Sequence, residues 1–480
     1  MELEALQSHN TEKKDSELKV NLKNISEEKR VIRGIQDVYG KLYDDIWFNK
    51  TIWNPQRNIW AVKALKQITL ARIAAPKSKK ASVEMLDRDY WIGLNLSTVY
   101  NMMKKISEKE IEKIQKISYK YTKNIFEEKL DVLFLDGTTL YFESEKEDDL
   151  RKPGYGKEGK PQDGKVLLLL FVTKEGLPVG YKLYPWNQYE GHTLQPMVEM
   201  VKKQYNIDKI FLSADSWFFS KDNIEYLEKN GHAYVLGARI KNLDKKLKWE
   251  ILDRNNYIVT KKGDDWEILT SHKEIDYNGQ RLIVSYSEKR ATKDKKQREK
   301  QVETLEKKVW QDTSIALWNF WYKKYIKKTW KKIEIDHEKM KDEEQRDGLK
   351  WVISNDRKKT AEEITGHYWK LRKIEESFRV NKHDLLIRPI FHRTEQKIKA
   401  HIAISYMAFT LVRHLEYRME LAWSKISPER IRTELLHIQW SILLDKATSK
   451  KYFLPSSISW VWEKIYKTIG LKWHNSVFEL

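Results

Sequence analysis

Between residues 130 and 240, apolar residues occur in short runs and alternations that are typical of β-strands. The runs predict five strands, at Asp131–Leu140, Val166–Thr173, Val179–Tyr184, Lys209–Ala214 and Ala233–Gly237. Stretches with helical spacing lie between them, at His192–Tyr205 and at Lys221–Asn230, the second closed by Gly231. The order strand, hairpin, helix, strand, helix, strand predicts an α/β core in which helices cover a mixed sheet.

The segment before this core has a helical period. Ile59, Ser82 and Ser97 mark the starts of three predicted helices, with Ser97 as the N-cap of the third. The Gly93–Asn95 break is compatible with a helix-turn-helix, although any small helical bundle would give the same pattern. Residues 1–30 mix charges of both signs with few aromatics, and we expect them to form a flexible arm.

After residue 350 the pattern is again helical and is expected to stay so to the end. Thr360 and Glu363 form a candidate capping box, and Ser427 with Pro428 marks the start of a later helix. The longest apolar helix, Ile398–Val412, is shorter than the roughly 20 residues that a bilayer requires, so we expect it in the core.

Residues 241–350 are much more charged than the core, and they predict an inserted module. The segment Trp318–Lys332 interleaves aromatic residues with lysines, a composition suited to stacking on bases while neutralising phosphates. An amphipathic element with a solvated lysine face would have the same composition. Leu349–Ser354 then predicts a strand that leads back into the core.

The chain carries a large positive charge. Its 90 Lys and Arg residues against 70 Asp and Glu residues give a net charge of +20 and a pI near 9.4. This excess favours a polyanionic partner, nucleic acid ahead of an anionic membrane surface, although a lysine-rich genome would also produce it. The absence of cysteine excludes disulfides, thiolate zinc sites and cysteine nucleophiles, and it fits a cytoplasmic protein.

Three acidic residues have settings that favour metal binding. Asp136 follows the apolar run Leu133–Leu135, Asp215 follows Ile210–Ala214, and Glu375 lies in a later helical stretch. Two acids at strand ends and one on a helix can converge on Mg²⁺, which prefers oxygen ligands, and two such ions can serve phosphoryl transfer. Each aspartate alone could instead be a turn former.

The predicted helix around Glu375 presents further polar residues. At about 100° per residue, Tyr368 and Lys382 lie on the face of Glu375, with Arg372 and Arg379 close to it. Such a face can hold a metal ion and clamp phosphates beside it. The same spacing would also allow ordinary salt bridges between Glu375 and the two arginines.

Longer segments around the three acids resemble a known family. These segments are LDGTTLYFES, LRKPGYGKEGKPQ, GLPVGYKLYPWNQYEGHTL, SADSWFFS and IEESFRVNKHDLLIRPIFH. Over roughly residues 40–420 they resemble the insertion-sequence transposases of the DDE class. Tyr368, Glu375 and Lys382 also fit the Tyr-x2-Arg-x3-Glu-x6-Lys (YREK) signature of the group with a β-rich insertion. The resemblance implies an α/β fold with an RNase H-like mixed-sheet core, a module inserted between the second and third catalytic acids, and helical N- and C-terminal regions.

By this resemblance, Asp136, Asp215 and Glu375 are the catalytic triad and hold Mg²⁺ or Mn²⁺, expected as two ions. Tyr368 and Lys382 are implied to hold the terminal phosphate of the transposon end.

The sequence departs from the family pattern at a few positions. Leu371 occupies the signature arginine position, so the missing cation would come from Arg372 or Arg379. Trp186 and Trp217 stand where smaller residues are expected, which keeps an inactive copy open as an alternative.

The resemblance implies a DNA transposase that cleaves at transposon ends and joins the freed 3′-hydroxyl to target DNA. Its partners would be double-stranded DNA, both terminal inverted repeats and target, and a second copy in a DNA-bound homodimer, at the nucleoid in a prokaryotic cytoplasm and without a membrane. A catalytically inactive DNA-binding derivative and a structure-selective RNase H-like nuclease are the alternatives. The implied domains are the flexible arm (1–30), a helical DNA-binding region (31–128), the first part of the catalytic core (129–240), the insertion domain (241–350), the second part of the core with Glu375 (351–395) and a C-terminal helical region (396–480).

Overall fold

The computed structural model describes residues 20–126, 132–142, 148, 150–152, 164–185, 193–207, 209–238, 245–261, 269–311, 325–328, 333–371, 379–380, 385, 387, 390–422, 424–457, 459–473 and 477–479. The chain folds into two compact units. We call Gln115–Lys382 with Ile387–Glu395 the core unit, and Met1–Ile114, His383–Leu386 and Gln396–Leu480 the terminal unit. The terminal unit therefore joins both ends of the chain, and the core unit contains Asp136 and Asp215.

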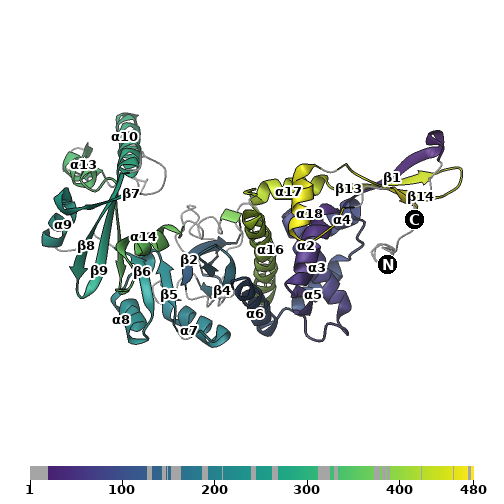
Figure 1. Ribbon diagram of the computed structural model, residues 1–480, viewed down its shortest axis with the longest axis horizontal. Coiled ribbons are helices and arrows are strands. Elements are labelled where there is room, and N and C mark those ends of the chain that lie inside the picture. Colours follow the sequence, from purple (N-terminus) through teal and green to yellow (C-terminus); the bar gives the residue numbers. More distant parts are fainter. Residues whose placement is uncertain are drawn as a thin grey trace. The chain divides into compact units, whose positions relative to one another are not determined.

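A nine-stranded sheet with the order β4-β3-β2-β5-β6-β12-β9-β8-β7 forms the centre of the core unit (Figure 1). Its first six strands are β2 Val132–Tyr141, β3 Lys165–Thr173, β4 Pro178–Pro185, β5 Phe211–Ala214, β6 Ala233–Gly237 and β12 Leu349–Ser354. Strands β2, β3 and β4 form an antiparallel meander, and β5 and β6 continue the sheet parallel to β2. This is the RNase H-like mixed sheet, and the predicted fold class is confirmed.

Helices cover both faces of this sheet. Successive strand residues point to opposite faces, so each face carries its own apolar cluster, and helices bury both clusters. Leu212 and Ala214 of β5 point to the face covered by α7 (Leu194–Tyr205) and α8 (Lys221–Lys229). Phe211 points to the opposite face, where it packs with Ile364 of α14 (Ala361–Trp369). The predicted helices after β4 and β5 are confirmed, and Gly231, at φ 66°, follows the end of α8 as expected.

The charged segment before β12 adds strands to this same sheet. It contains α9 Lys245–Leu252, η6 Arg254–Asn256, β7 Ile258–Lys261, β8 Leu269–Tyr277, β9 Gln280–Ser287, α10 Glu288–Gln311, β10 Ile326–Lys328, β11 Ile333–Ile335 and α13 His337–Glu344. Strand β9 pairs with β12, which pairs with β6. The expected separate module is thus corrected, since part of the insertion extends the core sheet by edge pairing.

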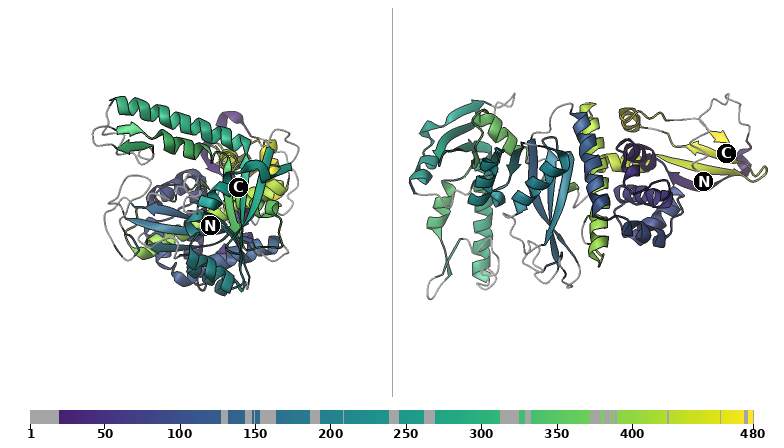
Figure 2. Two further views of the ribbon diagram at one scale, coloured as in Figure 1. Left: turned by 90° about the vertical axis from the view of Figure 1, so that its left-hand side faces the viewer. Right: turned by 90° about the horizontal axis from the view of Figure 1, so that it is seen from below.

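The elements α10, β10, β11 and α13 of the insertion do not belong to the nine-stranded sheet. Helices α10 and α13 lie side by side (Figure 2). Leu305 of α10 and Tyr325, which precedes β10, form a small apolar cluster, and Met340 of α13 packs against it. Arg298 of α10 forms an ion pair with Asp347. Of the aromatic and lysine-rich segment Trp318–Lys332, only residues 325–328 are among those described, so its predicted base stacking lies largely outside the described residues.

The terminal unit combines helices with a four-stranded antiparallel sheet. Its helices are η1 Leu22–Asn24, α2 Gly34–Asp45, η2 Phe48–Lys50, α3 Ile59–Ala74, α4 Lys79–Tyr90, α5 Leu96–Lys104, α17 Pro428–His437 and α18 Trp460–Thr468, with most of α16 Glu395–Leu421 and the start of α6 Glu108–Ile125. Its sheet has the order β1 Ile25–Ile32, β13 Gln439–Asp445, β14 Lys451–Pro455 and β15 Phe478–Glu479. Helix α16 is buried along most of its length, as predicted. None of the described helices is long and apolar enough to cross a membrane.

Two predictions about the chain ends are corrected. The end of the expected flexible arm, from Ile25 onward, is strand β1, and the expected all-helical C-terminus contains β13 and β14. Strand β1 pairs with β13 over Ile25–Ile32. A short local pattern cannot reveal this pairing, because each strand finds its partner at the opposite end of the chain.

Helix starts are confirmed in part. The capping box of Thr360 and Glu363 and the cap of Ser427 before Pro428 are both present. The Ser97 cap is wrong, because α5 already begins at Leu96.

Candidate active site

Asp136 and Asp215 occupy equivalent positions on neighbouring parallel strands. Leu135 of β2 pairs with Ala214 of β5, and each aspartate is the next residue in its strand direction. Leu135 and Ala214 point to the α7 side of the sheet. Because successive residues in extended backbone point to opposite faces, both aspartates lie on the side covered by α14. The structure therefore brings two of the three predicted acids together.

Asp136 lies inside β2 and not at a strand end, which agrees with the predicted strand Asp131–Leu140. Strand β2 continues to Tyr141, with Asp136 opposite Leu170 and Gly137 opposite Leu169 of β3. The Asp136 Oδ1 atom accepts a hydrogen bond of 2.7 Å from the Gly137 N–H. Asp136 marks the point where parallel pairing with β5 stops, and the alternative of a turn at Asp136–Gly137 is excluded.

Asp215 is held by two hydrogen bonds to one oxygen. It caps the short helix η4 (Ser216–Phe218), and its Oδ1 atom accepts a bond of 2.7 Å from the Ser216 N–H. The Tyr368 hydroxyl donates to the same Oδ1 atom at 3.3 Å. These contacts fix the orientation of the carboxylate, and they bring the predicted phosphate-binding tyrosine to a predicted metal ligand.

Tyr368 is positioned by the last turn of α14. Its ring packs against the apolar cluster of that face, and the Lys350 Nζ atom lies 5.8 Å from the ring centroid. A Cβ atom added at Gly237 would lie 2.6 Å from the Tyr368 hydroxyl oxygen and 3.0 Å from the Ser216 nitrogen. Gly237 thus provides the space through which Tyr368 reaches Asp215. Sequence reasoning missed this residue, although a glycine at the end of a buried strand was a visible signal.

The third predicted acid, Glu375, lies outside the described residues, as do Arg372 and Lys382. Helix α14 starts at the predicted cap but ends at Trp369. Its last turn tightens, since the Leu371 N–H donates to the Tyr368 carbonyl three residues back. The predicted helical stretch around Glu375, between Leu371 and Arg379, lies outside the described residues, and it stays a prediction.

The other predicted site residues fall in different places. Arg379 is exposed. Trp186 is outside the described residues, and Trp217 belongs to η4. In the described part of the chain, no group of three or more histidine, aspartate or glutamate side chains is arranged to hold a metal ion.

The surroundings of α14 are basic. Burial lowers the pKa of His367 below its ordinary 6.5, and the charges of Lys370 and Lys359 lower it further. The His367 ring centroid lies 5.0 Å from that of Phe211, and the Lys359 Nζ atom lies 4.8 Å from the Phe211 ring centroid. Lys359 also forms an ion pair with Asp356 at 2.9 Å.

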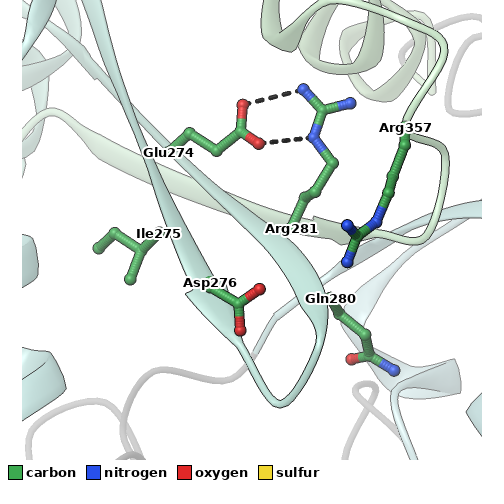
Figure 3. A pocket seen from close by; sticks show the side chains of 6 residues that line it. All are labelled: Glu274, Ile275, Asp276, Gln280, Arg281 and Arg357. Carbon is green, nitrogen blue, oxygen red and sulfur yellow. Dashed lines mark hydrogen bonds and ion pairs between the residues drawn. The ribbon is translucent and has the colours of Figure 1, made fainter.

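The loop before α14 is tied to the β8–β9 hairpin of the insertion. The Arg281 Nη1 atom donates to the carbonyl oxygens of Asp356 at 2.5 Å and Lys359 at 2.6 Å. Its Nε atom donates to Glu274 at 2.6 Å (Figure 3). Arg357 in turn donates to the Gly279 carbonyl at 3.0 Å.

These residues line a shallow cavity of about 300 Å³, formed by Glu274, Ile275, Asp276, Gln280, Arg281 and Arg357 (Figure 3). Neither Asp136 nor Asp215 belongs to it. Its walls join the insertion to the start of the helix that carries Tyr368.

Comparison with known proteins agrees with the predicted family. The profile described as "Transposase DDE domain" matches residues 127–411. Similar solved structures include a piggyBac transposase synaptic complex with hairpin DNA, at 10% identity and a TM-score of 0.41, covering 84% of this chain and 76% of that one. No curated protein matches this chain.

Two Mos1 mariner structures are also similar over shorter lengths. A paired-end complex with Mn shares 15% identity, with a TM-score of 0.14 and coverage of 32% of this chain and 52% of that one. A paired-end complex with the left transposon end shares 11% identity, with a TM-score of 0.16 and coverage of 48% and 64%. The family profile spans more than half of the chain and includes both aspartates of the sheet, so this chain belongs to the family of transposases with a DDE domain.

Proposed function

We propose that this protein cleaves DNA strands at transposon ends and transfers the resulting 3′-hydroxyl into target DNA, in a metal-dependent cut-and-paste transposition. One observation carries the proposal: Asp136 and Asp215 follow the paired residues Leu135 and Ala214 on the same face of the sheet. In a member of the DDE family, this adjacency is what two metal-binding acids require.

The chemistry of the two side chains fits Mg²⁺ or Mn²⁺, and we propose two ions. Two carboxylates held close together repel each other unless a cation lies between them. Oxygen ligands suit both metals, and a bound divalent cation supplies charge stabilisation to phosphoryl transfer. Glu375 is the proposed third ligand. Tyr368 contributes by holding the Oδ1 atom of Asp215, which leaves the direction of the carboxylate fixed before substrate binds.

Cations near α14 are proposed to hold the phosphates of the transposon end. Tyr368 and Lys382 would contact the terminal phosphate, and Arg372 or Arg379 would replace the arginine that Leu371 lacks. Membership of the YREK group with a β-rich insertion is part of this proposal. The net charge of +20 supports double-stranded DNA as the partner. The helical region 31–128 is proposed to bind this DNA, and the chain is proposed to act on it as a homodimer.

The proposal is tested by nicking of a labelled duplex that carries the element's own inverted repeat. With Mg²⁺ or Mn²⁺, wild type should nick the duplex, and D136N and D215N should lose at least roughly a thousand-fold in rate. Asn keeps the size of each side chain, so the folded state and duplex binding should persist. The exposed Asp222 of α8 provides a matched control, and D222N should nick as wild type does.

Equal nicking by D136N and wild type would exclude the assignment of the acids. Binding without nicking by wild type would favour the inactive DNA-binding derivative. Cleavage of branched DNA regardless of inverted repeats would favour the structure-selective nuclease.

A further inference from the structure

The stretch from Ile46 to Val83 contains no acidic residue, in a chain where 70 of 480 residues are Asp or Glu. Its cations are Lys50, Arg57, Lys63, Lys66, Arg72, Lys77, Lys79 and Lys80. The stretch covers η2, α3 and the start of α4 in the terminal unit. Arg72 and Lys79 are buried and Lys66 forms an ion pair with Asp44. The exposed cations of the stretch are Lys50, Arg57, Lys63, Lys77 and Lys80, and such a run of one charge sign favours an anionic ligand.

Three tryptophans are exposed where this stretch begins. The side chains of Trp47, Trp53 and Trp60 are 52%, 73% and 38% exposed, and Ile59 is 57% exposed. They lie in the segment Trp47–Trp60, which contains η2, the loop that follows it and the first two residues of α3, and which we call the tryptophan turn. Several large apolar side chains exposed within one short segment are typical of an interaction surface.

The backbone of the tryptophan turn is held in place by asparagines. Asn54 adopts a left-handed conformation with φ 45°. The Asn58 side-chain amide donates to the carbonyl oxygens of Trp53 at 2.8 Å and Asn54 at 3.2 Å. Because the loop conformation is already fixed, a ligand that contacts Trp53 would not have to order the loop.

Cations lie directly against two of the rings. The Lys50 Nζ atom is 3.9 Å from the Trp47 ring centroid, and the Lys105 Nζ atom is 5.7 Å from the Trp60 ring centroid. A ligand for this surface therefore needs flat apolar faces and negative charge together. A nucleotide whose base is unpaired has both, since its base can stack on indole while its phosphate meets an ammonium group. In a continuous duplex the base faces are covered by neighbouring base pairs.

We propose that the tryptophan turn binds unpaired nucleotides of a DNA strand. The inference rests on the proposed function, because strand cleavage at a transposon end creates single-stranded or opened DNA beside the cut. The tryptophans supply stacking platforms, and Lys50, Arg57 and Lys105 neutralise the backbone of the same strand.

The test measures DNA binding by the full-length protein without divalent metal, using fluorescence anisotropy of an oligothymidine single strand and of a blunt duplex. W53A and W60A should each weaken single-strand binding by roughly ten-fold and leave duplex binding nearly unchanged. W53F should restore most of the loss, because phenylalanine can also stack. K50Q should reduce the slope of log affinity against log salt by about 0.7 on the single strand.

A matched control exists in the same unit. Trp460 is 62% exposed with the Lys464 Nζ atom 4.8 Å from its ring, but it lies outside the acid-free stretch. W460A should bind both DNAs as wild type does.

Three outcomes would overturn the proposal. These are unchanged single-strand binding in W53A and W60A, an equal loss for single strand and duplex, and a change in oligomeric state with single-strand binding intact, which would make the turn a protein interface. Because this assay contains no metal, it measures DNA binding without cleavage. Failure of DNA cleavage and failure of nucleotide stacking are therefore separate results.

Discussion

The Tyr368 hydroxyl reaches Asp215 because residue 237 has no side chain. Strand β6 ends at Gly237, beside Ser216 and Tyr368, and an added Cβ would crowd both. The packing of the Tyr368 ring and its contact with Lys350 are independent of the hydroxyl group. The hydrogen bond to Asp215 can thus be removed without removing the ring.

At this residue scale, a double-mutant cycle tests the link between Gly237 and Tyr368. Y368F should lower the nicking rate by roughly ten-fold, because a hydrogen bond to a charged group is lost, while the melting temperature stays close to wild type. G237A should cause a similar loss by displacing the hydroxyl. In the double variant G237A/Y368F the two losses should add less than fully, because the displaced hydroxyl is absent and only the crowding of the Ser216 nitrogen remains. Full additivity would show that Gly237 acts elsewhere.

At the scale of elements, α14 depends on a strand of the insertion. Arg281 of β9 donates two hydrogen bonds to backbone carbonyls of the loop before the helix and binds Glu274 of β8. Extension of the core sheet by β7, β8 and β9 therefore does more than enlarge the sheet. Through Arg281, this extension holds the loop that precedes the helix carrying Tyr368.

R281Q should lower the unfolding free energy by about 2 kcal/mol and reduce nicking, since two carbonyls and one carboxylate lose their donor. E274Q leaves the carbonyl bonds in place and should cost less stability and no activity.

The Arg281 hydrogen bond holds the pKa of Glu274 below its ordinary 4.5. The difference in unfolding free energy between wild type and E274Q should thus be largest well above pH 4.5, and it should vanish as the pH falls below that value. Urea unfolding at neutral and acidic pH measures the unfolding free energy of both variants. Equal nicking by R281Q and wild type would contradict the dependence of α14 on Arg281.

At the scale of the whole molecule, the terminal unit is assembled from both chain ends. Arg33 and Gly34, at the start of α2, donate backbone hydrogen bonds to the Ile438 carbonyl. The Tyr466 hydroxyl of α18 donates to Asp37 at 3.0 Å, and Arg33 forms an ion pair with Asp37 at 2.9 Å. Burial raises the pKa of Asp37 against the effect of Arg33. This arrangement makes the N-terminal helices dependent on the C-terminal segment.

G34A should loosen the terminal unit without affecting the core unit. A Cβ there would overlap the Leu435 carbonyl oxygen and lie 2.9 Å from the Ile438 Cβ, at a cost of about 3 kcal/mol. Hydrogen exchange should accelerate in β13 and α18 and remain unchanged in β2 and β3. G93A is the control, since nothing lies within 4 Å of its added Cβ. Uniform acceleration across both units would show that they unfold together.

The strands around Asp136 and Asp215, the Thr360 cap and the family were evident from the sequence. These features depend on residues close together in the chain, where apolar runs and caps act locally, and the quoted segments around the acids carry the family resemblance. The same local order predicted an α/β core with a mixed sheet, and the family resemblance implied that this core is RNase H-like. The catalytic, metal-binding and DNA-binding roles stay predictions for all of the site residues, which are Asp136, Asp215, Tyr368, Arg372, Glu375, Arg379 and Lys382.

Tertiary structure alone decided how distant residues meet. The register of Leu135 with Ala214 makes the two aspartates neighbours, and Gly237 admits Tyr368 to them. Pairing of β1 with β13, and of β9 with β12, joins segments far apart in sequence. No local pattern specifies such contacts, because hydrogen bonding between strands and close packing are satisfied only once the partner segment has arrived.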